Sequence, residues 1–151
     1  MQAKELMQTG VVSVLIDATV EEIAELMVKH DISGLPVVND LGTVLGVVSE
    51  LDIMRKQIEP ETPSLWKLFV GQMKDGKSIE DYRDHLRRSL AKTAGEIMTS
   101  PAVTVDENDD IETVGQLMFD RRIKRVFVTR NGALVGVISR SAFVKRMIQA
   151  K

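Results

Sequence analysis

The chain has 151 residues, of which 44% are hydrophobic and 28% are charged, and its formal net charge at pH 7 is −2. This length can bury a core on its own, and the absence of cysteine excludes disulfides, thiolate catalysis and cysteine-based zinc sites. The nearly balanced charge argues against nucleic acid as a partner. The N-terminus lacks the apolar core of a signal peptide, and no apolar run approaches the roughly 20 residues of a membrane helix. We therefore expect a cytoplasmic protein, complete in itself, that does not enter a membrane.

The chain contains two copies of one sequence pattern. Residues Glu5–Met7 match Glu96–Met98 at an offset of 91 residues, and Gly46–Ser49 match Gly136–Ser139 at an offset of 90. The change in offset falls after Leu41, in a stretch that predicts a turn, where a repeat tolerates a deletion. A repeat of this length indicates two related units that pack against each other. We divide the chain into a first repeat, a segment outside the repeat, and a second repeat, at residues 1–57, 58–93 and 94–151.

Each copy predicts the elements β-α-β-β-α in chain order. The first copy predicts an extended stretch at 11–16, a helix from Thr19 to Asp31, strands at 35–38 and 43–48, and a helix capped by Ser49. Its first helix starts at a capping box, in which the side chains of Thr19 and Glu22 bond each other's backbone. The second copy predicts a helix capped by Asp110, strands at 125–129 and 134–138 joined by Asn131–Gly132, and a last helix capped by Ser139.

We expect a mixed α/β (α+β) fold. One β-α-β-β-α unit has too little apolar area to fold alone. Two units related by pseudo-two-fold symmetry would bring their sheets together and leave a cleft between them, with one related site per copy. The segment between them predicts an amphipathic helical pair, in which Ile79, Tyr82, Leu86 and Leu90 form one stripe. This pair either covers the chain's own core or forms a surface for a partner.

The stretch Gly46–Asp52 is the strongest candidate for a functional site. It predicts an apolar strand that passes directly into a helix, with Ser49 at the turn and Asp52 one helical turn further on. A helix N-terminus offers free N–H groups and about +0.5 charge, which suits an anion. A carboxylate only accepts hydrogen bonds, which suits a vicinal diol. Ser-x-x-Asp is also an ordinary capping box, and both roles can hold together.

The paired pattern resembles the tandem CBS domain, or Bateman module, of the small stand-alone type. The resemblance covers both copies, about 110 of the 151 residues. Each copy has Val-Ser/Thr-Val, a helix, an apolar strand, and then Gly-Val-Val/Ile-Ser. Two motifs that this family associates with adenosine nucleotides occur in the first copy, at Ile32–Pro36 and Gly46–Asp52. The resemblance implies a module that binds an adenosine-containing ligand between its two repeats.

The resemblance also implies which residues contact that ligand. The Asp52 carboxylate would accept hydrogen bonds from the ribose hydroxyls, and Ser49 would face phosphate. Leu35–Pro36 would form an apolar wall for adenine, which would also read backbone groups around Val12–Ser13. Basic residues of the second copy would reach phosphate across the cleft, although Lys124 and Arg125 also fit a solvated strand entrance. The complete predicted set is Val12, Ser13, Gly34, Leu35, Pro36, Ser49, Asp52, Val103, Thr104, Lys124, Arg125, Ser139 and Arg140.

The second copy departs from the family pattern at two places. Val126–Phe127 stands where the first copy has Leu35–Pro36, and Ala142 stands where it has Asp52. Without the carboxylate, the ribose diol loses its acceptor, and an unpaired buried hydroxyl costs roughly 1–3 kcal/mol. We therefore expect one good site and one site that is weak or empty.

These observations favour a regulatory sensor for AMP, ADP, ATP or S-adenosylmethionine that needs no cofactor. The alternative is an interaction scaffold that binds no ligand and regulates a partner protein. We do not expect an enzyme, because no residues form a nucleophile–base pair. His30 and His85 are far apart and have no carboxylate at metal-ligand spacing, so we expect no metal site. The resemblance implies a homodimer that pairs through helix faces.

Overall fold

The structure, a computed structural model, describes residues 1–58 and 93–149. The helical pair that the sequence predicts between the repeats lies outside these residues. The first repeat contains β1 (Val14–Leu15), α2 (Val20–His30), β2 (Gly34–Val38), β3 (Val44–Ser49) and α3 (Glu50–Ile58). The second repeat contains β4 (Thr104–Asp106), α7 (Ile111–Asp120), β5 (Arg125–Arg130), β6 (Ala133–Ser139) and α8 (Arg140–Gln149). The predicted order β-α-β-β-α is confirmed in both copies.

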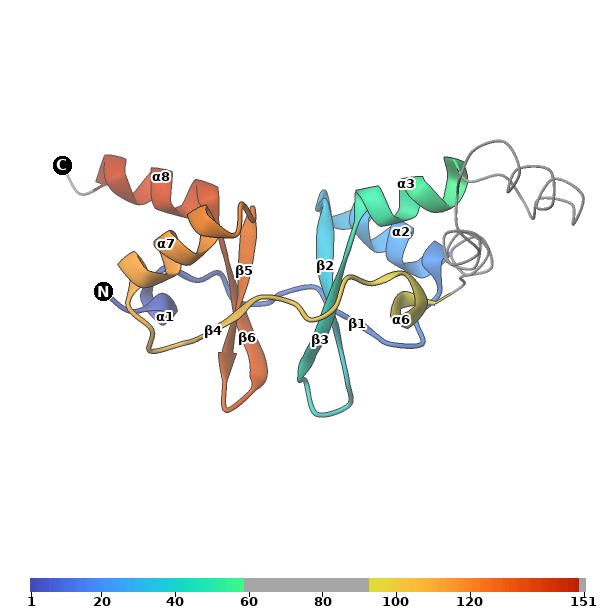
Figure 1. Ribbon diagram of the computed structural model, residues 1–151, viewed down its shortest axis with the longest axis horizontal. Coiled ribbons are helices and arrows are strands. Elements are labelled where there is room, and N and C mark those ends of the chain that lie inside the picture. Colours follow the sequence, from blue (N-terminus) through green and yellow to red (C-terminus); the bar gives the residue numbers. More distant parts are fainter. Residues whose placement is uncertain (59–92, 150–151) are drawn as a thin grey trace, which may run out of the picture.

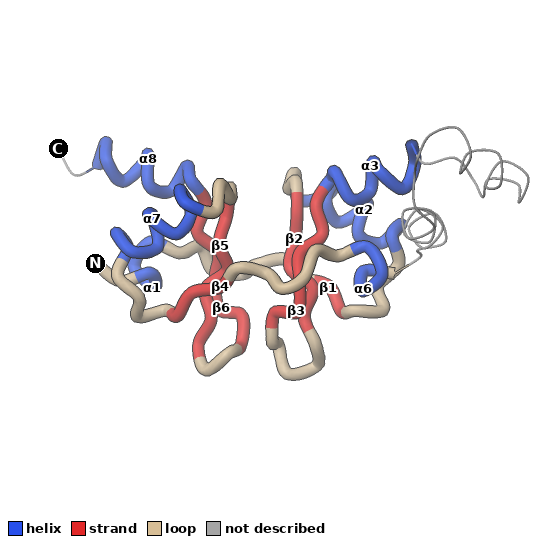
Figure 2. The backbone as a smooth tube through the Cα atoms, viewed as in Figure 1, coloured by secondary structure: helices blue, strands red, loops and turns tan. Residues whose placement is uncertain are grey.

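Each repeat forms a three-stranded sheet with the same topology. The strand orders are β1-β2-β3 and β4-β5-β6, in which the first pair is parallel and the second pair is antiparallel. The two sheets stand side by side at the centre of the molecule, and helices α2, α3, α7 and α8 lie on their outer sides (Figures 1 and 2). This arrangement is the pseudo-symmetric pairing that the sequence predicts.

Local signals in the sequence set the element boundaries. The Thr19–Glu22 capping box is present, with the Glu22 N–H 3.2 Å from Thr19 Oγ1 and the Thr19 N–H 2.8 Å from Glu22 Oε2. The Asp110 carboxylate caps α7 by accepting the Glu112 N–H at 3.0 Å. Helix α2 ends where Asp31 adopts a left-handed conformation, with φ of 51°.

The hairpin turns account for the one-residue change in the repeat offset. In the second copy, Asn131 and Gly132 have φ of 50° and 81°, as a two-residue hairpin turn requires. In the first copy the Asn39 N–H donates to the Thr43 carbonyl at 3.1 Å, so three residues, 40–42, form the turn, one more than in the second copy. Asn39 Oδ1 holds this turn by accepting the N–H groups of Leu41 and Thr43 at 3.0 and 2.9 Å. The two hairpins also join the repeats, because the Leu134 N–H donates to the Gly42 carbonyl at 3.0 Å.

The repeats exchange their short lead-in segments. Helix α1 (Ala3–Leu6) lies at the start of repeat 1 in sequence but packs into the core of repeat 2, with Val105, Val114 and Ile138. Helix α6 (Ala94–Ile97) lies at the start of repeat 2 but packs into the core of repeat 1, with Val14, Ile23 and Val48. Sequence order assigned each segment to the repeat that follows it, whereas each core in fact contains an element from the other copy.

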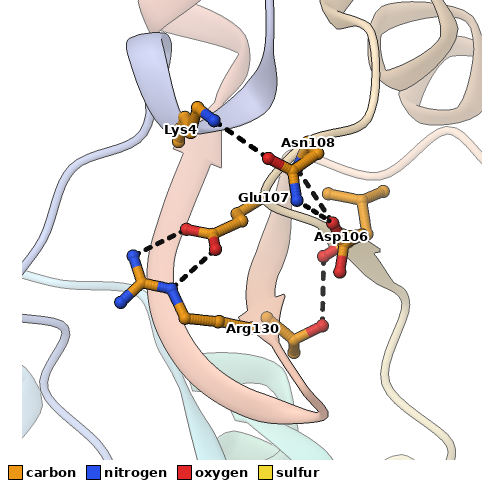
Figure 3. Close-up of polar contacts among 7 residues, drawn as sticks. Lys4, Asp106, Glu107, Asn108 and Arg130 are labelled. Atoms are coloured by element: carbon orange, nitrogen blue, oxygen red, sulfur yellow. Dashed lines mark hydrogen bonds and ion pairs between the residues drawn. The ribbon is translucent and has the colours of Figure 1, made fainter.

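Polar contacts also hold α1 on repeat 2 (Figure 3). Lys4 Nζ donates to Asn108 Oδ1 at 2.9 Å. Beside this contact, within repeat 2 itself, Arg130 donates through Nε and Nη2 to the two carboxylate oxygens of Glu107, at 2.6 and 2.7 Å. These hydrogen bonds hold the pKa of the Glu107 carboxyl below its usual range. The equivalent positions in repeat 1 carry no such pair, because Ile16 occupies the place of Glu107.

Neither a long apolar helix nor a cluster of metal-ligating side chains occurs among the described residues. Within residues 1–58 and 93–149, no helix is long and apolar enough to cross a membrane. Over the same ranges, the side chains of His, Asp and Glu form no group of three that could hold a metal ion.

Candidate functional site

A cavity of about 350 Å³ spans the boundary between the two repeats. Its walls combine apolar side chains with two basic residues, one acidic residue and three hydroxyl-bearing residues, of which one is a serine at a helix start. Repeat 1 contributes Ser33, Gly34, Val47, Ser49, Glu50 and Leu51. Repeat 2 contributes Thr99, Pro101, Ala102, Val103, Ile123, Lys124, Arg125 and Phe127. Five of the predicted site residues therefore meet here: Gly34, Ser49, Val103, Lys124 and Arg125.

The exchange of lead-in segments decides which backbone lies beside Ser49. Val47, in β3, pairs with Thr99 through two backbone hydrogen bonds of 3.0 and 2.9 Å. The chain after Thr99 therefore enters the cavity, and Val103 lines it. The sequence grouped Val12 and Ser13 with Ser49, but neither residue lines this cavity. Their segment leaves repeat 2, where Gln8 pairs with Val137 of β6 in the same way.

The predicted apolar wall also comes from the other repeat. Leu35 and Pro36 are buried in β2 and do not line the cavity, and Leu35 belongs to the repeat 1 core. Phe127, the pseudo-equivalent of Pro36, lines it instead. Because the cavity crosses the boundary, it combines the helix start of one repeat with the strand residues of the other.

Ser49 and Asp52 hold each other at the start of α3. One oxygen of the Asp52 carboxylate, Oδ2, accepts both the Ser49 N–H at 2.8 Å and the Ser49 hydroxyl at 3.0 Å. Through these bonds the Asp52 carboxylate caps the start of α3, as the Ser-x-x-Asp pattern predicts. Asp52 is half-buried and is not among the residues that line the cavity. A carboxylate can accept about four hydrogen bonds, so these two contacts leave capacity for further donors.

The basic residues of repeat 2 take three different positions. Arg125 lines the cavity and reaches across to repeat 1, where it donates to the Gly34 carbonyl at 2.6 Å and to the Ser33 hydroxyl. Lys124 lines the cavity and is exposed to solvent. Arg140 lies outside the cavity wall, with its Nε bonded to the Ile123 carbonyl at 2.9 Å.

The remaining predicted residues of the second copy lie apart from this cavity. Ser139 is half-buried, and its hydroxyl is 2.7 Å from that of Ser141. Thr104 is exposed at the start of β4. Ala142 is half-buried and packs against the hydrophobic core of repeat 2. The residue that replaces the first copy's carboxylate thus contributes an apolar core contact.

A second hollow, of about 600 Å³, lies on the outer side of repeat 1. It is formed by β1 and α2, and none of the predicted site residues line it. Although it is larger and includes the start of α2 at Thr19, repeat 2 contributes nothing to it. Its charged side chains are mainly acidic, with Asp17, Glu22 and Glu25 against Lys29. The cavity between the repeats is therefore the better candidate for the functional site.

Comparison with known proteins identifies the fold and the family. The CBS domain family model matches the chain twice, at residues 3–59 and 94–149, which are the two repeats. The chain belongs to the CBS domain family. This finding confirms the resemblance seen in the sequence and the tandem arrangement of the two units.

Relatives of the family match the CBS pair along most of its length. The chain is 26% identical over 135 residues to the chloroplastic CBS domain-containing protein CBSX2 of Arabidopsis thaliana. That match spans 88% of this chain but 57% of CBSX2, so the CBS pair covers little more than half of this relative. The chain is 27% identical over 155 residues to the uncharacterized protein MJ1426 of Methanocaldococcus jannaschii, with coverage of 98% and 92%.

A solved structure of CBSX2 in complex with AMP superposes on the CBS pair with a TM-score of 0.78 and 26% sequence identity. The superposition covers 99% of this chain and 98% of the CBSX2 chain. The mixed α+β fold with two packed repeats is therefore confirmed.

Proposed function

We propose that this chain is a non-catalytic regulatory module that binds an adenosine-containing ligand, best an adenine nucleotide, in the cavity between its CBS repeats. The observation that carries the proposal is the composition of that cavity, in which Val103 and Phe127 lie among apolar neighbours while Ser49, Lys124 and Arg125 supply polar groups. The AMP complex of CBSX2, a relative that matches the whole pair, supports the ligand class.

The size and chemistry of the cavity suit such a ligand. Its volume of about 350 Å³ falls within the roughly 300–1,000 Å³ typical of small-molecule sites. Phe127 and Val103 offer apolar surface to a base. Lys124 and Arg125 offer positive charge to phosphate, and Ser49 stands immediately before the N-terminus of the nine-residue helix α3. Asp52, one turn further on, is the proposed partner of the ribose hydroxyls.

The proposed regulatory effect of the ligand follows from the fact that both repeats line the cavity. Because each repeat contributes to the cavity, a bound ligand would contact both and stabilise one relative placement of the repeats. A partner protein that binds preferentially to that placement would sense the ligand. The alternative, an interaction scaffold without a ligand, draws on the Ser49–Asp52 capping contact, which occupies part of the proposed site.

Titration calorimetry of the protein with AMP, ADP, ATP and S-adenosylmethionine tests this proposal. We expect binding of at least one nucleotide, and about tenfold weaker binding by Asp52→Ala, because a ribose hydroxyl would lose its acceptor. Asp40→Ala is the matched control, since Asp40 lies exposed in the first hairpin turn and should leave affinity unchanged. No binding by the wild-type protein at millimolar nucleotide would favour the scaffold. Equal affinities for wild type and Asp52→Ala would remove Asp52 from the site.

We also propose a homodimer that forms through the outer helices. Large apolar side chains are exposed there at pseudo-equivalent positions of the two repeats: Val28 and Phe119 are 83% and 79% exposed, and Met54 and Val144 are 53% and 58% exposed. Association would remove this apolar surface from water. Light scattering at micromolar concentration should give the dimer mass for the wild type and a monomer mass for Phe119→Asp combined with Val144→Asp.

A control variant separates this face from exposed apolar residues in general. Leu41 is also exposed, but it lies on the hairpin turn away from the outer helices. Leu41→Asp should therefore remain dimeric. A wild-type monomer, or a dimer that survives the double substitution, would contradict the proposed interface.

A further inference from the structure

The two repeats differ at the first residue of their second strand. Repeat 1 has Gly34 there, paired with Ser49, and repeat 2 has Arg125, paired with Ser139. Both residues line the cavity between the repeats. One copy therefore brings a cation to this cavity from the position where the other copy brings only backbone.

The Arg125 side chain uses this difference to cross between the repeats. Its Nη1 donates to the Gly34 carbonyl at 2.6 Å, and its Nη2 donates to the Ser33 hydroxyl. A Cβ atom at position 34 would crowd the Val48 carbonyl oxygen at 3.1 Å and would touch Arg125 Nη1 at 3.5 Å, an ordinary contact distance. A guanidinium has five N–H donors, and these two bonds leave the others for a further acceptor.

Ser33 connects this guanidinium to the helix start in the same cavity. Its hydroxyl accepts from Arg125, while its carbonyl accepts the N–H of Glu50, the first residue of α3, at 3.0 Å. In repeat 2 the equivalent carbonyl, that of Lys124, accepts the Arg140 N–H at 3.1 Å. On the other side of the pseudo-axis, Lys124 stands in the place of Ser33 and has no hydroxyl, and Gly34 stands in the place of Arg125. A serine–arginine contact of this kind can therefore form on only one side of the pseudo-axis.

We propose that Ser33 is a positioning residue that fixes the Arg125 guanidinium for the anionic group of the ligand. The pair thereby makes the cavity select phosphate-bearing over uncharged adenosine-containing ligands. An arginine side chain has many rotamers, and anchoring two of its donors beforehand lowers the entropy lost when the others bind phosphate. This inference rests on the proposed function, because it assumes that the adenosine-containing ligand occupies this cavity.

The test compares AMP with adenosine, which differ only in the phosphate. Calorimetry should show that the wild type binds AMP at least about tenfold more tightly than adenosine, as one good charge-assisted contact provides. Ser33→Ala should weaken AMP binding about three- to tenfold, the worth of one hydrogen bond, while the adenosine affinity stays within about twofold. Arg125→Ala should reduce the preference for AMP further than Ser33→Ala does, and the remainder is expected from Lys124 and the start of α3.

Two further variants separate positioning from a purely structural role. Ser33→Thr retains the hydroxyl and should restore the AMP preference. Arg125→Lys retains the positive charge but lacks the planar guanidinium, so it should keep only part of the preference for AMP over adenosine. Ser141→Ala, which removes a serine hydroxyl outside the cavity, should leave both affinities unchanged. Thermal unfolding of each variant checks that the fold is intact.

The outcomes distinguish failure of this inference from failure of the proposed function. If Ser33→Ala weakens AMP and adenosine equally, or weakens neither, then Ser33 does not position Arg125 for phosphate, and the inference is overturned while nucleotide binding stands. If neither ligand binds the wild type, the proposed function fails and the inference fails with it. A loss confined to AMP, restored by Ser33→Thr, supports it.

Discussion

Replacing Gly46 with alanine should lower the free energy of unfolding by about 3 kcal/mol, near the upper end of the usual cost of overpacking. A Cβ atom at this position would lie 2.7 Å from Met98 Sδ and 2.7 Å from the Thr99 carbonyl oxygen. The methionine can move, but the carbonyl cannot, because Thr99 is bonded to Val47 through its own backbone on both sides. The glycine of the Gly46–Asp52 motif thus admits the lead-in segment of the other repeat.

Gly136→Ala is the matched control for Gly46→Ala, because Gly136 is the pseudo-equivalent glycine of repeat 2. A Cβ atom there would lie 2.5 to 3.0 Å from three atoms of the Met7 side chain, and the nearest contacts include no backbone atom. A methionine adapts its rotamer, so the expected loss is only about 1 kcal/mol. Urea denaturation of the three proteins measures both values. Equal losses for the two variants would show that the Thr99 backbone does not limit the space at Gly46.

Much of the fold was predictable because its signals are local. The capping residues Thr19 and Asp110 each require only neighbours within one helical turn, and both cap their helices. The hairpin at Asn131–Gly132 is specified by the two residues that adopt positive φ. Because the sequence pattern occurs twice, each helix or strand predicted in one copy is also predicted in the other, and the two weak local signals support each other.

The exchange of lead-in segments was not predictable in this way. The match of Glu5–Met7 with Glu96–Met98 shows that the two segments are alike, but for that reason each would fit either core. Only the backbone contacts of Gln8 with Val137, and of Thr99 with Val47, show which partner each segment takes. The same ambiguity explains why the sequence groups Val12 and Ser13 with Ser49, whereas Val103 lines the cavity there.

The candidate site was predictable to the extent that it depends on a motif. Ser49 lines the cavity, as the strand-to-helix pattern predicts, and Lys124 and Arg125 reach it from the other repeat. Ser33 and Phe127 were missed as members of this site, because they matter only where the two repeats meet. The sequence did carry one signal for Ser33: its neighbour Gly34 aligns with Arg125, and a small residue opposite a long cation in a pseudo-symmetric pair indicates that the cation crosses the axis.

A charge placed in the N-terminal segment should destabilise the C-terminal repeat. Ala3 and Ala94 are pseudo-equivalent, and both side chains are 0% exposed, but Ala3 lies in the repeat 2 core and Ala94 in the repeat 1 core. Ala3→Glu would bury an unpaired carboxylate, at a cost of several kcal/mol. Hydrogen exchange should therefore show the larger loss of protection in β5, β6 and α7, about 100 residues along the chain from the substitution.

The reciprocal variant makes the exchange of segments directly testable. Ala94→Glu should reduce protection mainly in α2, β2 and β3 of repeat 1, because α6 packs there. Two observations favour this crossed result: the two cores are separate clusters, and Ala3 is anchored to repeat 2 by its N–H bond of 2.8 Å to the Asp109 carbonyl. If each substitution instead loosened the repeat that follows it in sequence, the segments would not be exchanged in solution. The placement of Val103 beside Ser49, on which the proposed ligand site depends, would then be lost as well.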